Sequence, residues 1–196
     1  MKNLSGFLLL ACAVGLSSCE GCGDPEPPVN SEIRWANDVT VFETADVDAV
    51  TLSPYMGFDS VEPFLQYPGK GVYLLGVTSN AGAADLETHD LASGRKVFEL
   101  VGDMASRASD NPAGEGSIGL VLGLTNVSDD VLARMPDVPL LIPGLGAQGG
   151  DLETLRGANR TAPNVINVSR GILYADEHLS FTEKAKDYAN RIADIA

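Results

Sequence analysis

The chain has 196 residues, 44% of them hydrophobic, and its 13 basic and 27 acidic residues give a formal net charge of −14. This length can bury one substantial hydrophobic core, so one folded domain is expected. The acidic balance argues against nucleic acid and against an anionic membrane surface as general partners. A phosphate-bearing ligand would therefore need a local binding site.

The N-terminus has the pattern of an export signal over residues 1–18. Lys2 supplies a positive charge, and an apolar stretch from Gly6 to Leu16 follows it. The next residues, Leu16-Ser17-Ser18-Cys19, resemble the lipobox of bacterial lipoproteins, which implies cleavage before Cys19 and lipid attachment there. The predicted location is then a membrane-anchored lipoprotein facing the periplasm or the cell exterior. A plain signal peptide, an N-terminal anchor, or a misassigned N-terminus on a cytoplasmic protein are the alternatives.

All three cysteines of the chain lie in or beside this signal: Cys12, Cys19 and Cys22. The remainder has no disulfide framework or cysteine-based metal site. Cys19 and Cys22 have the spacing of a redox or metal motif, but no second ligand pair accompanies them. His89 and His178 are isolated in polar stretches and are expected on the surface, so no metal site is predicted.

Residues 19–30 have the composition of a solvated tether, because EGCGDPEPPVN combines three prolines, two glycines and three acids. The folded domain is predicted to span residues 31–196. Within it, short apolar runs predict five buried strands, at 49–52, 71–77, 118–124, 140–142 and 165–168. Helical spacing or polar patterning predicts helices between and around them, at 33–44, 60–66, 129–134, 152–157 and 181–195. Residues 86–107 are also predicted to contain a helix, in which Ser93-Gly94 weakens the first part and apolar residues recur at helical spacing from Val97. Regular alternation of strand and helix predicts an α/β fold with a parallel sheet.

Two of these strands lead into glycine-rich exits. The run LLIPGLGAQGGD presents Gln148, and the run VINVSRG presents Arg170. Loop amides, a helix start and a guanidinium group are a common way to hold a phosphate after neighbouring parallel strands. A tight turn without a ligand is the alternative. A dinucleotide fingerprint at Gly144 to Gly149 is disfavoured, because the strand and acidic residue that such a motif requires do not follow.

Five segments carry a family resemblance. They are DAVTLSPYMGFDSVEPFL, GVYLLGVTSNAGAADLE, GLVLGLT, LLIPGLGAQGGDLE and INVSRGILYA. Their order and approximate spacing resemble orotidine 5'-monophosphate decarboxylases of the shorter bacterial subgroup, from about Ser31 to the C-terminus. The resemblance implies part of a (β/α)8 barrel, usually dimeric, that converts orotidine monophosphate to uridine monophosphate and CO2 in pyrimidine biosynthesis. It implies no metal or organic cofactor.

The same resemblance assigns binding residues for a phosphorylated pyrimidine nucleotide. Gln148 and Gly149, with Arg170 and Gly171, correspond to the family's phosphate site. Ser79 lies on the loop that contacts the pyrimidine, and Pro143 lies where the family packs a proline near the base. The base-binding loop departs from the family pattern in one respect, since Ala81 stands where a proline is common.

The family's catalytic set is not found in this sequence. Its chemistry uses an Asp-x-Lys-x-x-Asp motif, in which the lysine stabilises and protonates the carbanion left by CO2, and the 196 residues contain no such motif. The first three strands of the barrel are expected to be missing. Lys70 precedes a strand, while Lys96, Lys184 and Lys186 fall on predicted helices, and all four are expected to be solvated surface charges. No catalytic residue is therefore assigned.

Three functional hypotheses stay open. In the first, the chain is a lipid-anchored, decarboxylase-derived protein that binds a phosphate ester without catalysis. In the second, it is half of an enzyme that becomes active when another polypeptide supplies the missing strands, or whose true gene start differs from this one. The third hypothesis is a non-enzymatic envelope lipoprotein in which the barrel remnant serves as an interaction surface.

Overall fold

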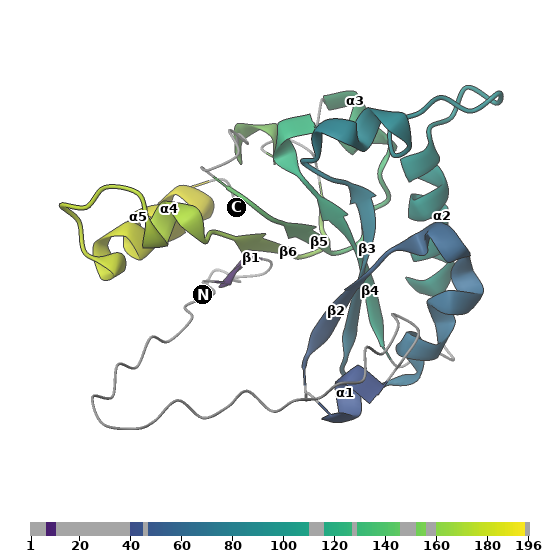
Figure 1. Cartoon of the computed structure of the whole chain (residues 1–196), viewed down its shortest axis with the longest axis horizontal. Coiled ribbons are helices and arrows are strands. Elements are labelled where there is room, and N and C mark those ends of the chain that lie inside the picture. Colours follow the sequence, from purple (N-terminus) through teal and green to yellow (C-terminus); the bar gives the residue numbers. More distant parts are fainter. Residues whose placement is uncertain are drawn as a thin grey trace.

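The fold is a parallel sheet with helices packed against it, seen in a computed structural model that describes residues 7–10, 40–44, 47–109, 116–126, 129–145, 152–155 and 160–194 (Figure 1). The strands are β1 (Phe7–Leu10), β2 (Ala49–Leu52), β3 (Gly71–Val77), β4 (Ser117–Leu122), β5 (Leu140–Ile142) and β6 (Asn164–Asn167). They pair in the order β1-β6-β5-β4-β3-β2, and every pair is parallel. The prediction of an α/β fold with five parallel strands is confirmed.

The sixth strand, β1, was not predicted. Phe7 to Leu10 pair with Asn164 to Asn167 along one edge of the sheet. A short apolar run has the same sequence pattern in a signal peptide and in a buried parallel strand, so periodicity cannot separate the two. Whether residues 1–18 are cleaved as an export signal is a question of processing, which the fold does not test, so the signal stays a prediction. The tether and Cys19 lie outside the described residues.

The helices follow the predicted alternation. They are α1 (Thr40–Thr44), α2 (Val97–Ser109), α3 (Asp129–Arg134), α4 (Arg170–Leu173) and α5 (Phe181–Ala193), with 3-10 turns that include Glu62–Gln66 and Leu152–Leu155. Helix α4 was not predicted, and residues 33–39 of the first predicted helix lie outside the described residues. Among the helices of the described part, none has the length and apolar character needed to cross a bilayer.

The helix predicted within residues 86–107 is α2, and the first part of that segment, weakened by Ser93-Gly94, is not helical. Residues 81–85 form a 3-10 turn, and α2 begins only at Val97. Gly94 adopts a left-handed φ of 78°, which ends any helix across it. The Glu99 carboxylate then accepts a hydrogen bond from the Lys96 amide at 2.7 Å, which satisfies a backbone donor at the start of α2. Local side-chain and glycine effects thus fix where the helix begins.

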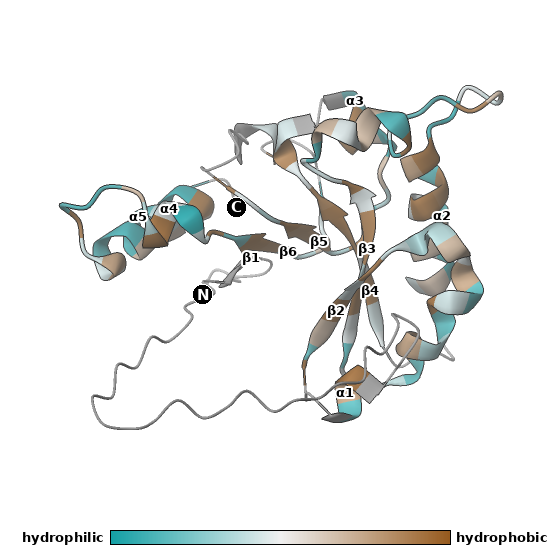
Figure 2. Cartoon of the chain, in the orientation of Figure 1, coloured by the Kyte–Doolittle hydropathy of each residue, from teal (hydrophilic) through white to brown (hydrophobic). Residues whose placement is uncertain are grey.

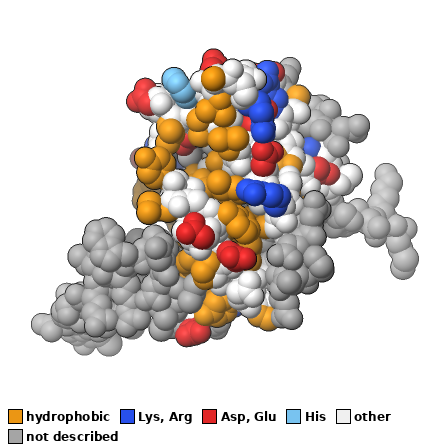
Figure 3. All heavy atoms as spheres, turned by 90° about the vertical axis from the view of Figure 1, so that its right-hand side faces the viewer, with side chains coloured by type: hydrophobic (Ala, Val, Ile, Leu, Met, Phe, Trp, Pro, Cys, Tyr) orange, Lys and Arg blue, Asp and Glu red, His pale blue; other side chains and the backbone are white. Residues whose placement is uncertain are grey.

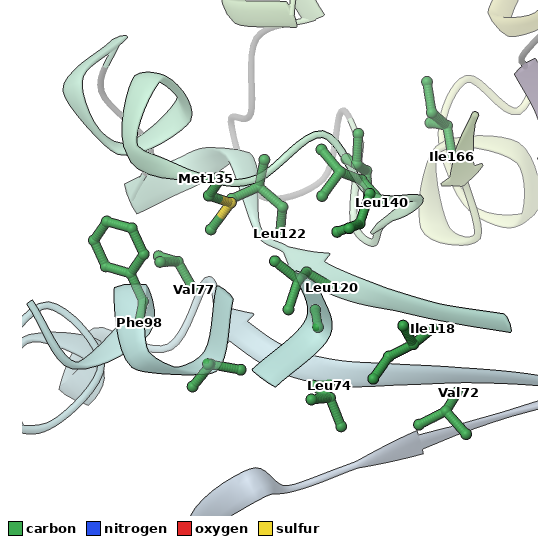
Figure 4. Close-up of a cluster of buried hydrophobic side chains, with 14 of the residues drawn as sticks. Val72, Leu74, Val77, Phe98, Ile118, Leu120, Leu122, Met135, Leu140 and Ile166 are labelled. Atoms are coloured by element: carbon green, nitrogen blue, oxygen red, sulfur yellow. The ribbon is translucent and has the colours of Figure 1, made fainter. Parts of the chain in front are cut away.

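The core lies between the sheet and the helices that cover it. Leu74, Leu120 and Leu140 on neighbouring strands are fully buried, and Phe98 of α2 packs with the same cluster (Figure 4). Buried positions 98, 101, 102 and 105 recur at helical spacing along α2. Figure 2 shows hydrophobic residues along the central strands and mixed character along α5. Each large apolar side chain buried in this way contributes about 1.5–3 kcal/mol.

A network of hydrogen bonds around Arg160 connects the amino ends of β5 and β6. Its guanidinium donates to the Pro136 carbonyl at 3.0 Å and to the Val138 carbonyl at 2.6 Å. Asp137 accepts hydrogen bonds from the Thr161 amide and hydroxyl, which lower the pKa of its carboxyl group, and it lies 3.8 Å from Arg160. Burial lowers the pKa of the Arg160 guanidinium. This network fixes the register of two strands whose opposite ends carry predicted site residues.

Candidate functional site at the carboxyl edge of the sheet

The predicted site residues within the described part of the chain lie at one edge of the sheet. Ser79 follows β3, Pro143 follows β5, and Arg170 and Gly171 follow β6. Because all strands run parallel, their carboxyl ends meet at the same edge. Two strands separate β3 from β6, so three strand spacings, roughly 14 Å along the sheet, divide the two ends of the site. Gln148, like its neighbour Gly149, lies outside the described residues.

At one end of this edge, the Ser79 hydroxyl is buried and has no hydrogen-bond partner among the described residues. A buried hydroxyl without a partner loses about 1–3 kcal/mol relative to a satisfied one. Such a group is expected where a ligand supplies the missing partner.

The backbone that carries Ser79 is fixed from two sides. The Glu87 carboxylate accepts a hydrogen bond from the Thr78 amide at 2.7 Å and another from the Thr78 hydroxyl at 2.9 Å. On the other side, Gly123 comes so close that a Cβ at this position would collide with Ser79. Glycine is therefore required at position 123. Sequence reasoning missed Glu87, because it lies nine residues beyond Thr78 and no sequence motif links the two.

In the middle of the edge, the chain turns sharply after β5. Pro143 is partly exposed, and Gly144 after it adopts a left-handed φ of 79°. A glycine takes this conformation without steric penalty. The turn leaves Pro143 at the carboxyl end of β5, between the ends marked by Ser79 and Arg170.

At the far end, Arg170 is exposed and is the first residue of α4. Within the described part of the chain, its guanidinium makes no hydrogen bond or ion pair. The preceding turn is ordered by the Ser169 hydroxyl, which donates to the Asn167 side-chain oxygen at 3.3 Å. The arrangement offers a planar, permanently charged fork to an anion.

The lysines are only partly as predicted. Lys70 lies at the amino end of β3, away from the site edge, and Lys186 is exposed on α5. Lys96 precedes α2 instead of lying on a helix, and it pairs with Asp90 at 2.8 Å. The prediction of a solvated surface charge is wrong for Lys184, because this residue is only 7% exposed. Lys184 lies on the buried side of α5. Helical spacing alone did not indicate this, because a lysine is rarely buried.

The histidines were predicted correctly as surface residues, since His89 and His178 are both exposed. Across the described ranges, no three His, Cys, Asp or Glu side chains gather in a way that could hold a metal ion.

An apolar groove of about 430 Å³ lies beside this edge, between the segment after β2 and helix α2. Its lining includes Tyr55, Leu86 and Leu100, which are 78%, 49% and 40% exposed. Figure 3 shows hydrophobic side chains running across this face of the molecule. Exposed apolar surface of this kind is typical of a protein interface.

The sequence matches a known family over residues 35–185, described as the orotidine 5'-phosphate decarboxylase / HUMPS family. The chain belongs to this family. Orotidine 5'-phosphate decarboxylase from Ralstonia nicotianae is 45% identical over 158 residues, which are 78% of this chain and 57% of that protein. The Dechloromonas aromatica decarboxylase is also 45% identical, over 80% of this chain and 58% of its own.

Solved structures agree with this assignment to the orotidine 5'-phosphate decarboxylase family. The Leishmania donovani OMP decarboxylase superposes with a TM-score of 0.67 at 32% identity, covering 82% of this chain and 62% of that one. The L. donovani UMP synthase gives a TM-score of 0.67 at 35% identity, over 82% of this chain and 36% of that one. The chain thus spans little more than half the length of the curated relatives that it matches, and its fold corresponds to part of their α/β barrel.

Proposed function

We propose that this chain binds the phosphate ester of a pyrimidine nucleoside at the carboxyl edge of its sheet, and that by itself it does not decarboxylate orotidine monophosphate. The observation that carries the proposal concerns two groups at one edge of the sheet. Among the described residues, the buried Ser79 hydroxyl has no hydrogen-bond partner and the exposed Arg170 has no counterion. Membership of the decarboxylase family supports this choice of ligand.

In the proposed complex, the ligand lies along the edge with its base near Ser79 and Pro143. The Ser79 hydroxyl donates to a carbonyl of the base or accepts from its ring N–H. The phosphate lies at the β6 end, where Arg170 provides charge-assisted hydrogen bonds. Gln148 and Gly149, with the Gly171 amide, are proposed to complete this phosphate site.

The proposed lack of catalysis rests on the residues of this chain. The sequence contains no Asp-x-Lys-x-x-Asp, which the family resemblance requires for proton delivery to the reacting carbon. Among the described lysines, Lys70 lies at the opposite end of β3, and the Lys184 ammonium is already bonded to a backbone carbonyl. Binding energy from the phosphate therefore has no reacting centre on which to act. A second copy or a complementing chain docked against the apolar groove is the route by which activity could arise.

The test uses the full chain, residues 1–196. Decarboxylation of orotidine monophosphate is assayed, uridine monophosphate is titrated calorimetrically on the same sample, and light scattering reports the oligomeric state. Binding without turnover is the expected result. Turnover by the isolated chain would contradict the proposed inactivity, whereas absence of binding would remove the proposed site.

The envelope lipoprotein is the alternative function, and it is favoured by the export-signal pattern of residues 1–18 directly before Cys19. Cleavage before Cys19 would also remove β1 and leave β6 as an edge strand. Cys19→Ser is expected to release the protein from the membrane fraction of cells that express it. Unchanged membrane association of this variant would exclude lipid attachment at Cys19.

A further inference from the structure

Lys184 is a buried lysine that the proposed function does not use. Only 7% of the residue is exposed, and its ammonium donates to the Ala175 carbonyl at 2.6 Å. The same nitrogen lies 5.2 Å from the centre of the Phe181 ring, within the range of a cation–π contact. A lysine ammonium is almost never buried without specific partners, because its desolvation is unfavourable. Its placement therefore points to a defined role.

The Ala175 carbonyl, which accepts from Lys184, lies two residues beyond the end of α4. This helix comprises only Arg170 to Leu173, and its last turn is closed by the Tyr174 amide, which donates to the Arg170 carbonyl at 3.0 Å. A helix of four residues is not stable in isolation, so its position depends on tertiary contacts. The bond from Lys184 to Ala175 fixes the carboxyl end of this segment.

Helix α5 also contacts α4 near its amino end, and the two helices lie side by side beyond β6 (Figure 1). A Cβ atom on Gly171 would collide with the phenol group of Tyr188. The Arg191 guanidinium lies over the same ring, 5.1 Å from its centre. Helix α5 thus contacts the α4 segment at Gly171, within the turn that Arg170 begins, and at Ala175, beyond its end.

The connection between the two helices is itself tightly constrained. Asp176 has a left-handed φ of 44°, which is unusual for a residue other than glycine, and its carboxylate accepts from the His178 amide at 3.0 Å. Ser180 and Glu183 form a reciprocal capping box at the start of α5. Because the connection is ordered and both ends of α4 are held, α5 sets the position of the turn from which Arg170 projects.

We infer that Lys184 is a positioning residue for Arg170, and that it supports phosphate affinity through the Ala175 carbonyl without touching the ligand. The inference rests on the proposed function for its ligand. It predicts that losing the Lys184 ammonium weakens binding only for ligands that carry a phosphate.

The experiment compares Lys184→Met with Lys186→Met in the full chain, since Lys186 is exposed on the same helix. Lys184→Met is expected to weaken uridine monophosphate binding at least fivefold in calorimetry and to leave uridine binding unchanged, while Lys186→Met changes neither. Lys184→Arg keeps a cationic donor and is expected to recover part of the loss. In an Arg170→Ala background, Lys184→Met should have no further effect. The inference would be overturned if Lys184→Met weakened the binding of uridine and of uridine monophosphate equally. It would also be overturned if the losses of affinity caused by Lys184→Met and Arg170→Ala were fully additive in the double variant.

A second measurement separates this inference from the proposed function. Amide hydrogen exchange of residues 170–176 without ligand should be faster in Lys184→Met than in Lys186→Met, with exchange in β3 and β4 unchanged. If the parent protein binds no uridine monophosphate, the ligand assignment fails, and exchange still tests the contact between the helices. Unchanged exchange at residues 170–176 would overturn the positioning role, whether or not the nucleotide binds.

Discussion

Two arginines flank strand β6, and their surroundings are opposite. Arg160 precedes the strand, its side chain is 8% exposed, and its guanidinium is bonded to the carbonyls of Pro136 and Val138. Arg170 follows the strand, is exposed, and has no partner within the described residues. The residue type is the same at both ends of the strand, so the difference lies in the hydrogen-bond acceptors that the chain provides at each end. The amino edge supplies acceptors from the chain itself, whereas the carboxyl edge leaves its cation available to a ligand.

The larger expected effect is on the buried arginine. Arg160→Ala removes both bonds to the Pro136 and Val138 carbonyls and leaves Asp137 without its nearest cation. The free energy of unfolding in urea is expected to fall by about 2–4 kcal/mol. A decrease in the free energy of unfolding of less than about 0.5 kcal/mol would mean that the Arg160 network does not stabilise the amino ends of β5 and β6.

A smaller effect, and of a different kind, is expected from the exposed arginine. Arg170→Ala should lower the affinity for uridine monophosphate by about 1.5–3 kcal/mol, because it removes charge-assisted hydrogen bonds to the phosphate. The free energy of unfolding should stay within about 0.5 kcal/mol of the parent value, as for other exposed positions. The comparison would fail if Arg170→Ala destabilised the fold as much as Arg160→Ala, or if both variants bound the nucleotide as the parent does.

Much of the fold was predictable from local patterns. The apolar runs at 71–77 and 140–142 match β3 and β5, and the polar patterning at 129–134 matches α3, because burial on a parallel strand and helical spacing leave clear signals. The start of α2 was predictable only in part: the sequence marked Ser93-Gly94 as a weak point, but the Glu99 contact with the Lys96 amide has no sequence signal. The strand at Phe7–Leu10 was missed because its pattern is shared with an export signal.

The residues of the candidate site were predictable from the sequence, but their burial and their hydrogen-bond partners were not. Family resemblance pointed to Ser79 and Arg170, yet only the packed structure shows that the Ser79 hydroxyl is buried and finds no partner in the part of the chain that is described. Burial depends on what comes near from distant parts of the chain, here Gly123 and the loop of Glu87. The same reason explains the wrong prediction for Lys184, whose carbonyl partner at Ala175 is not visible as a sequence pattern.

The sequence by itself determined the parallel α/β fold, the family and the residue types at the carboxyl edge, because strand patterns and motifs are written in local order. Tertiary structure decided which cations are structural and which are available to a ligand. Arg160, Arg170 and Lys184 all carry the same charge, and only their neighbours in space distinguish them. A buried cation requires acceptors from the fold, whereas an exposed one keeps its hydrogen-bonding capacity for a partner.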